Sequence, residues 1–272
     1  MKYRFTNEAD EKKLYEFLSE KIVGLRISVI KRQAKLGEIR VNGLKTRENV
    51  KLSAGDYVDI FLPENSLCEP PVEIVYSDEN LIIVCKPSEM DTENNLVAAL
   101  RRSEGDLFPV HRLDRNTQGL VILARDKETE SLLVKAIKER KIRKFYRALL
   151  YGNFDIKEFT AVAYLVKDEK NSIVKVYRES VKNGKRIETR YKVVEEFYGY
   201  SDVEIELVTG RTHQIRAHSS FLGHPVLGDG KYATREIIDK FDYKSQQLKA
   251  VRLVFKELNG KLSYLNGKII EV

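Results

Sequence analysis

Cysteine and histidine are scarce in this sequence. The 272 residues include two cysteines, Cys68 and Cys85, and four histidines. Two cysteines cannot build a disulfide framework or a four-ligand zinc site, and the scattered histidines do not complete one. Three of them, His213, His218 and His224, are near one another in sequence, but the first two are five residues apart and do not share a helix face. We therefore expect no metal site.

Long apolar runs and proline are also scarce. No run of about 18 apolar residues occurs, and residues 1–17 alternate charged with apolar side chains, so neither a signal peptide nor a membrane span is predicted. We expect a cytoplasmic protein with no membrane partner. Hydrophobic residues make up 42% of the chain and there are six prolines, which indicates ordinary globular folding as one large or two modest domains.

Positive charge is unevenly distributed along the chain. Residues 21–51 contain nine Lys or Arg and two Asp or Glu, so this segment alone accounts for the net charge of +7. Residues 135–147 add seven basic residues against Glu139 alone. Concentrated positive charge favours a polyanionic partner such as RNA, although many charge runs are simply solvated faces.

The segment 1–62 predicts a small domain of two helices and short strands. Apolar residues at helical spacing predict a helix over 12–22, and an N-capping serine predicts a second over 28–35. Residues 38–43 alternate and end in Asn-Gly, which is the strongest short-range signal for a β-hairpin. Residues 50–62 supply the return strands.

Residues 63–71 contain three prolines and predict a linker, after which 72–272 forms a second domain. The pattern of residues in this second domain predicts an α+β fold with a mixed, mainly antiparallel sheet flanked by helices. The expected strands are 73–76, 81–85, 120–125, 143–150, 159–166, 172–178, 185–208 and two or three within 247–272; the expected helices are 96–102, 128–141 and one ending before 223. The helix over 128–141 is capped by Asp126 and is expected to bury Leu132, Leu133, Ala136 and Ile137.

The segment 111–120 reads His-Arg-Leu-Asp-Arg-Asn-Thr-Gln-Gly-Leu and places Asp114 between two arginines, just before an apolar strand. Nearby guanidinium groups favour the ionised carboxylate, so we expect Asp114 to act as a charged nucleophile or base and not as a proton donor. The alternative is structural. An Asp before Asn-Thr is also a common turn, and Arg-Leu-Asp-Arg can be a surface ion-pair cluster of little consequence.

The same segment resembles the signature of the RluA-type pseudouridine synthases, His-Arg-Leu-Asp-Arg-x-Thr-x-Gly-Leu. The resemblance implies that Asp114 is the catalytic residue, that Arg112 replaces the flipped-out base in the RNA stack, and that His111 contacts the substrate. It extends to a Lys-x-Tyr at 144–146, where it implies that Tyr146 stacks on the target uracil or takes part in proton transfer. Without the resemblance, a tyrosine in a strand is more often a core residue.

A second segment, 211–218, reads Arg-Thr-His-Gln-Ile-Arg-Ala-His and also resembles this family. The resemblance implies that Arg216 pairs with the catalytic Asp, that Ile215 packs on the base and that Arg211 contacts the substrate. Isomerising uridine breaks an N-glycosidic bond and rejoins the uracil through its carbon 5 without any redox change. We therefore expect no cofactor, in agreement with the absence of a phosphate loop or a dinucleotide fingerprint.

Residues 10–62 resemble the αL RNA-binding module of a small-subunit ribosomal protein and of several RNA-modifying enzymes. The resemblance implies that basic residues on and before the second helix face RNA phosphates: Arg26, Lys31, Arg32 and Lys35. Such side chains can instead cover a small core with their apolar stems. We expect a monomeric enzyme whose partner is structured RNA, ribosomal RNA before transfer RNA.

The chain departs from the family pattern at four places. Glu89 stands where glycine is usual, and Thr92-Glu93 stands where Val-His is usual, which leaves the conformation and RNA contacts of residues 88–95 open. Gln118 and Lys249 are further departures, the latter within Leu-Lys-Ala where the family has Leu-His-Ala.

Two rival functions follow from the same residues. A non-catalytic RNA-binding protein for ribosome assembly would need the basic segments but no buried acid. A hydrolase with Asp114 as base would release free uracil, but nothing in the chain marks a partner that activates water. Whether Asp114 attacks the sugar or abstracts its proton is not decided by the sequence.

Overall fold

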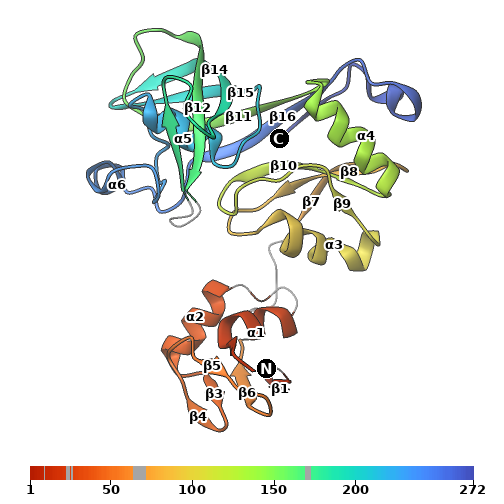
Figure 1. Ribbon diagram of the computed structural model, residues 1–272, viewed down its shortest axis with the longest axis vertical. Helices are drawn as coiled ribbons and strands as arrows, with labels where there is room; N and C mark the ends of the chain where they lie inside the picture. Colours follow the sequence, from red (N-terminus) through yellow and green to blue (C-terminus); the bar gives the residue numbers. More distant parts are fainter. Residues whose placement is uncertain (9, 23–24, 26, 64–71, 169–172) are drawn as a thin grey trace. The chain divides into compact units, whose positions relative to one another are not determined.

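The computed structural model describes the chain except residues 9, 23–24, 26, 64–71 and 169–172, and it describes residues 28 and 102 without their side chains. The chain divides into two compact units (Figure 1). Unit 1 comprises Met1–Val72 and Asn94–Gly105, and unit 2 comprises Glu73–Glu93 and Asp106–Val272. The predicted linker, 63–71, lies outside the described residues from 64 onward, as does the side chain of the predicted cap Ser28.

Unit 1 contains a four-stranded antiparallel sheet in the order β1-β6-β3-β4 and a short two-stranded ladder. The turn between β3 and β4 is the predicted Asn42-Gly43, and both residues have positive φ, as a tight hairpin turn requires. The elements are β1 (Lys2–Thr6), β2 (Lys12–Lys13), α1 (Leu14–Lys21), α2 (Ile27–Leu36), β3 (Ile39–Val41), β4 (Leu44–Lys45), β5 (Lys51–Leu52), β6 (Tyr57–Phe61) and α3 (Val97–Glu104), the last preceded by a π-helical turn, Thr92–Leu96.

The core of unit 1 forms between α1, α2 and the sheet. Its fully buried residues include Leu14, Leu18, Ile30 and Ile60. β1 was not predicted, although its charged and apolar residues alternate as a half-buried strand requires.

Unit 2 is built on one eleven-stranded sheet with the main order β13-β12-β14-β15-β11-β16-β10-β8-β7. All its pairings are antiparallel except that of β10 with β16, so the predicted α+β class with a mixed, mainly antiparallel sheet is confirmed. The strands are β7 (Glu73–Ser77), β8 (Leu81–Lys86), β9 (Phe108–Pro109), β10 (Gln118–Ala124), β11 (Ile142–Tyr151), β12 (Glu158–Asp168), β13 (Ile173–Tyr177), β14 (Lys185–Phe197), β15 (Tyr200–Leu207), β16 (Leu248–Phe255) and β17 (Ile269–Glu271).

The parallel pair depends on a glycine. Gly119 has φ +109, and a Cβ there would lie 2.0 Å from the carbonyl oxygen of Ala250. Only glycine lets β10 approach β16 this closely, which brings two of the unusual residues, Gln118 and Lys249, into register.

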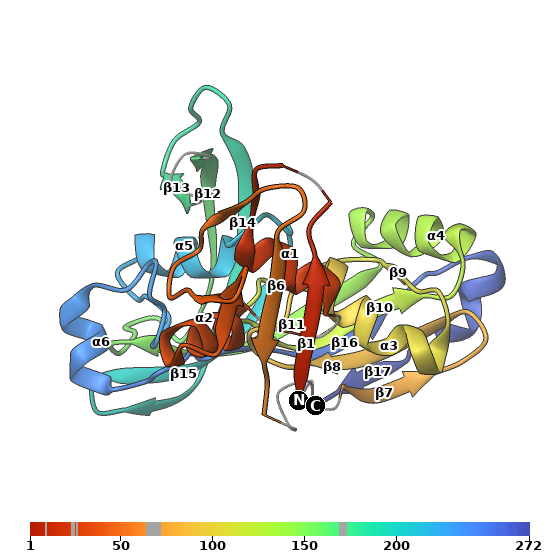
Figure 2. The same cartoon turned by 90° about the horizontal axis from the view of Figure 1, so that it is seen from below.

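Helices α4 (Lys127–Lys138) and α5 (Gln214–Phe221) lie on the same side of the long sheet (Figure 2). Leu133 and Ala136 of α4 join the core cluster of β8, β10 and β16, and Ala217 of α5 joins a second cluster with β12, β13 and β14. Two further segments, α6 (Arg235–Phe241) and a 3₁₀ helix (Gly260–Leu265), were not predicted. No helix in the described part of the chain is long and apolar enough to cross a membrane.

The predicted N-cap of α4 is confirmed, but the predicted buried side and the predicted C-terminal end of the helix both differ from the structure. Asp126 caps the helix by accepting a 2.7 Å hydrogen bond from the amide of Thr129. The prediction that Leu132 is buried is wrong, since it is 37% exposed; the helical rotation between neighbours turns it away from the side that buries Leu133. The helix ends at Lys138, three residues earlier than predicted, because Arg140 has a positive φ of 61°.

Candidate active site

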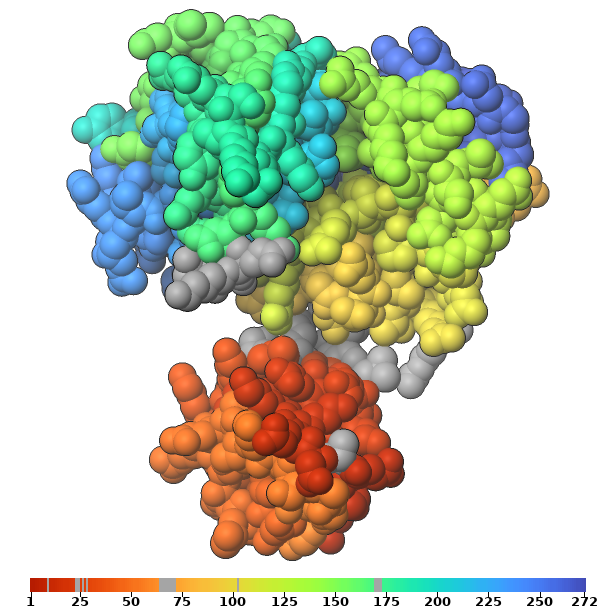
Figure 3. All heavy atoms as spheres, in the orientation of Figure 1, coloured from red at the N-terminus to blue at the C-terminus, as the bar shows by residue number. Residues whose placement is uncertain are grey.

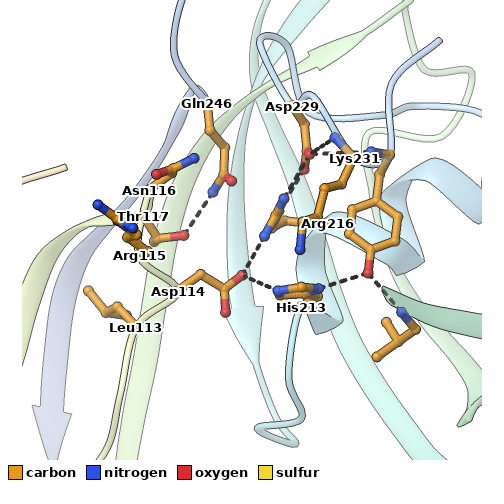
Figure 4. Close-up of polar contacts among 12 residues, drawn as sticks. Leu113, Asp114, Arg115, Asn116, Thr117, His213, Arg216, Asp229, Lys231 and Gln246 are labelled. Carbon is orange, nitrogen blue, oxygen red and sulfur yellow. Dashed lines mark hydrogen bonds and ion pairs between the residues drawn. The ribbon is translucent and has the colours of Figure 1, made fainter. Parts of the chain in front are cut away.

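Asp114 lies in the connection between β9 and β10, at the start of a turn. The amide of Thr117 donates a 3.0 Å hydrogen bond to the carbonyl oxygen of Asp114, and the hydroxyl of Thr117 accepts one from Gln246 at 2.8 Å. The backbone therefore does form the turn that the structural alternative describes. The side chain, however, is 20% exposed and points away from these amides toward α5 (Figure 4).

Arg216, in the first turn of α5, binds two carboxylates at once. Its Nη1 donates to Oδ2 of Asp114 at 2.9 Å, while Nε and Nη2 donate to Asp229 at 2.6 and 2.8 Å. Burial disfavours the charged guanidinium, but the hydrogen bonds and charges of Asp229 and Asp114 outweigh it and raise the pKa of Arg216. A fully buried Asp229 thus fixes the guanidinium that holds Asp114.

His213 is the third side chain at Asp114. It has a left-handed backbone, with φ 52°, just before α5. This conformation places its Nε2 3.8 Å from Oδ2 of Asp114, with its Nδ1 2.8 Å from the hydroxyl of Tyr232 (Figure 4). Burial lowers the pKa of His213 despite the opposing effect of Asp114, so the ring is neutral at pH 7. We call Asp114, His213, Arg216 and Asp229 the acid cluster.

A buried lysine fixes the chain that follows Asp114. Lys86 is fully buried at the end of β8, and its Nζ donates to the carbonyl oxygens of Pro87, Met90 and Arg115 at 2.9, 2.6 and 3.1 Å. Burial lowers the pKa of Lys86 to about 8, with Asp114 opposing the change. In the same loop Glu89 has φ 64°, a conformation that glycine adopts at no steric cost.

A cavity of about 640 Å³ lies beside the acid cluster, lined by Asp114, Tyr146, Ile215 and Arg216 among others. Its walls come from α4, β11, β14, β15 and α5; Figure 3 shows α4 in yellow-green and β14 in blue-green on one face of unit 2. Tyr146 is buried, and burial together with the charge of Asp114 raises its pKa, so its hydroxyl remains protonated at neutral pH.

Three other predicted substrate-contacting residues also line the cavity. Arg112 is 65% exposed and makes a 3.0 Å ion pair with Glu93, one of the unusual residues. Arg211 is exposed just before α5. His111 instead supports the strand, because its Nε2 accepts a 3.2 Å hydrogen bond from the amide of Ile122. Burial and the charge of Lys144 lower the pKa of His111 to about 3, so it is neutral.

The histidines that raised the question of a metal have separate partners. His213 contacts Tyr232, His218 contacts the hydroxyl of Thr189 at 3.0 Å, and Nδ1 of His224 lies 2.8 Å from the carbonyl oxygen of Tyr151. Over the described residues, no group of three or more His, Cys, Asp or Glu side chains is arranged to hold a metal ion.

On α2 of unit 1, Lys31, Arg32 and Lys35 are exposed. Arg26, the fourth basic residue assigned to RNA phosphates, lies outside the described residues.

Sequence reasoning missed Asp229, His213 and Lys86 as parts of the site. Lys86 carried a signal, since a lysine that closes the apolar strand Leu-Ile-Ile-Val-Cys is buried unless the strand is at an edge. Asp229 carried none, because nothing in a Gly-Asp after two apolar residues says which cation it will meet. His213 was considered only as a metal ligand.

Residues 63–221 match the RNA pseudouridylate synthase family. This chain belongs to that family, in its RluA group. A relative from Vibrio cholerae, named ribosomal large subunit pseudouridine synthase C, is 33% identical over 89% of this chain and 82% of its own length. A Bacillus subtilis relative, named uncharacterized RNA pseudouridine synthase YlyB, is 32% identical over 77% of this chain and 75% of its own length.

Solved structures agree with the assignment to the pseudouridine synthases. Human RNA pseudouridylate synthase domain containing 1 superposes with a TM-score of 0.63 at 26% identity, covering 75% of this chain and 85% of its own. Human RNA pseudouridylate synthase domain containing 4 has a TM-score of 0.56 at 21% identity, covers 71% of this chain and 91% of its own, and supports the fold. As a member of this family, the chain is an isomerase that acts on RNA.

Proposed function

We propose that this pseudouridine synthase isomerises specific uridines of large-subunit ribosomal RNA, with Asp114 as its catalytic carboxylate. The observation that supports this most is the placement of Asp114: a carboxylate held by Arg216 at the wall of a 640 Å³ cavity. Cavities of a few hundred Å³ suit ligands of the size of a nucleotide. The choice of ribosomal RNA rests on the name shared by several relatives, including those from Vibrio cholerae and Salmonella typhimurium.

The proposed chemistry needs one anionic group and an apolar surface that holds the detached uracil while it rotates. The bond between C1′ and N1 breaks, the uracil rotates, and a bond forms between C1′ and C5; the proton lost from C5 is balanced by one gained at N1. Asp114 attacks the sugar or abstracts its proton, and Arg216 holds the carboxylate in place through a charge-assisted hydrogen bond. Because no electron is transferred, we propose that the reaction needs no cofactor.

Tyr146 and Ile215 are proposed to hold the base while it is free. Both are buried and line the cavity, which supplies one aromatic and one branched apolar surface. A neutral tyrosine hydroxyl beside the carboxylate can also donate or relay a proton, and the raised pKa of Tyr146 keeps that proton in place.

Arg112 is proposed to enter the RNA stack when the target base leaves it. Flipping a base out costs a few kcal/mol, and a planar guanidinium that fills the gap recovers part of this cost by stacking. Its exposure leaves it accessible, and its ion pair with Glu93 is exposed and therefore weak enough to exchange for RNA.

Residues 1–62 are proposed to be an αL-type RNA-binding domain, joined through 63–71 to a catalytic domain over 72–272. The exposure of Lys31, Arg32 and Lys35 on α2 supports contact with phosphates, and we extend this role to Arg26.

The test is a map of pseudouridines in the ribosomal RNA of cells with and without the gene. The proposal expects one or a few large-subunit uridines to be modified only when the gene is present, and the purified protein to modify the same sites in transcribed RNA. A non-catalytic assembly factor would leave the map unchanged. A hydrolase would release free uracil and create abasic sites, which strand scission with aniline detects.

A further inference from the structure

Lys144 lines the cavity but has no hydrogen-bond or ion-pair partner among the described residues. It is 8% exposed on β11, two residues before Tyr146, and both side chains line the cavity. The group that lacks a partner is the side-chain ammonium. Burial alone lowers the pKa of Lys144 to about 8, because no nearby carboxylate compensates for the loss of hydration.

The neighbouring cations of the same strand behave differently. Arg143 forms a double hydrogen bond with Glu206 at 2.7 and 2.9 Å, and Arg147 forms one with Asp202 at 2.7 Å for both contacts. Arg143 and Glu206 line the same cavity as Lys144, but within the described residues Glu206 pairs with Arg143 and Arg190 and not with Lys144. Among the described residues, Lys144 is the cation of this strand that lines the cavity without an acid partner, and Tyr146 lines it two residues further along.

Three more cations of the same cavity also lack partners among the residues that the structure describes. Lys138 at the end of α4, Arg140 in the turn after it and Arg211 before α5 line the same cavity, and within the described part of the chain their side chains make no hydrogen bond or ion pair. We call Lys138, Arg140, Lys144 and Arg211 the free cations. The backbone also leaves room for the ammonium, since a Cβ at Gly210 would lie 3.2 Å from Nζ of Lys144.

We propose that Lys144 binds a backbone phosphate of the RNA strand beside the target uridine, with Arg211 at the entrance of the same subsite. A buried cation without a counter-charge is costly, and a ligand that brings a full negative charge into the cavity removes that cost. A phosphate carries such a charge in every nucleotide, whereas the oxygens of an intact uracil carry only partial charges. The proposal rests on RNA being the substrate.

The experiment compares two short oligouridines, one with natural phosphodiesters and one with uncharged methylphosphonate linkages. Replacement of the amine in Lys144→Met is expected to weaken binding of the natural strand roughly tenfold at low salt and to leave the neutral strand unaffected. The slope of log affinity against log salt should fall by about 0.7. Lys144→Arg keeps the charge and should retain most of the affinity, and Lys256→Met removes an exposed lysine outside the cavity as the matched control.

A second readout does not depend on any variant. With lysines labelled at Cε with ¹³C, the Lys144 signal should titrate near pH 8 in the free protein and at higher pH when the natural strand is added, because an anion favours the charged amine. Gly210→Ala should weaken this response, since the added methyl displaces Nζ.

The proposal is overturned if Lys144→Met weakens both strands equally, which would assign the amine to a base or sugar, or if neither strand moves the Lys144 signal. Failure of the proposed function is a separate result. It would appear as wild-type protein that makes no pseudouridine, while the Lys144 signal would still decide whether the phosphate subsite exists.

Discussion

The acid cluster and the free cations belong to one site but differ in how their charge is balanced. In the acid cluster each charge meets an opposite charge inside the protein, as Arg216 does with Asp114 and Asp229. The free cations meet none among the described residues. Charges compensated within the fold are fixed before any ligand arrives, as a reacting group requires, whereas uncompensated charges remain available to a charged ligand. We infer that chemistry and RNA binding are divided between the two sets.

Removing the carboxylate of the acid cluster should have the largest effect. Asp114→Asn keeps the shape of the side chain and its acceptor toward Arg216 but loses the charge needed for attack or proton abstraction. We expect pseudouridine formation to fall by roughly four orders of magnitude or more, the range seen when an essential nucleophile or base is removed. Single-turnover assays on a transcribed ribosomal RNA fragment measure it, and residual activity within tenfold of wild type would exclude the role.

Asp229→Asn should remove the charge that fixes Arg216 in the acid cluster. Arg216 would lose a charge partner while still buried, which destabilises the fold by about 3–5 kcal/mol. The matched control is Asp202→Asn, which breaks the partly exposed pair with Arg147 and should cost about 1 kcal/mol or less. Urea unfolding compares the two. Equal losses would show that the burial of the Arg216 pair is unimportant.

Two histidines, the buried His218 and the partly buried His111, should make stability depend on pH below neutrality. Burial lowers the pKa of His218 to about 4, and burial with the charge of Lys144 lowers that of His111 to about 3. The unfolded chain takes up protons near pH 6.5 and the folded chain does not, so the stability present above pH 6.5 is lost as the pH falls toward 4. At pH 5 the loss is about 2 kcal/mol per histidine.

Urea unfolding at pH 7 and pH 5 measures this loss. A variant with both histidines replaced, His111→Gln with His218→Gln, should be less stable at pH 7 but should lose less between the two values. A wild-type protein equally stable at both would contradict the lowered pKa values of these two histidines.

The smallest effect is expected at the exposed pair between Arg112 and Glu93. Glu93→Gln should change the free energy of unfolding by less than about 1 kcal/mol, because both side chains are mostly in solvent. RNA affinity should rise by up to about threefold as the competing carboxylate is removed from Arg112. Filter binding at two salt concentrations measures it; a loss of affinity would mean that Glu93 positions Arg112 for RNA instead of competing for it.

Parts of the fold and of the candidate site could be predicted from the sequence, because their signals are local or belong to a family motif. The hairpin at Asn42-Gly43 and the cap at Asp126 are local signals, and the structure confirms both. The resemblance of 111–120 and 211–218 to one family named Asp114 and Arg216, which lie 102 residues apart and meet at 2.9 Å.

The remainder depends on tertiary contacts that no local pattern encodes. Asp229 matters because α5 presents Arg216 to it, and Lys144 is unusual because no carboxylate interaction offsets the cost of its burial. β1 was missed because its partner, β6, lies more than fifty residues along the chain. The helix α6 is only seven residues long and has no buried residue, so its sequence is too short for a clear apolar periodicity.

The division of roles is tested most directly by one measurement, the single-turnover rate of pseudouridine formation at saturating RNA for Asp114→Asn and Lys144→Met side by side. If the acid cluster performs the chemistry and the free cations bind phosphate, Asp114→Asn loses the reaction while its RNA affinity stays within a few-fold of wild type. Lys144→Met then needs more RNA to saturate and loses no more than about tenfold in rate. A Lys144→Met enzyme as inactive as Asp114→Asn at saturation, or an Asp114→Asn enzyme that still forms pseudouridine, would contradict this account.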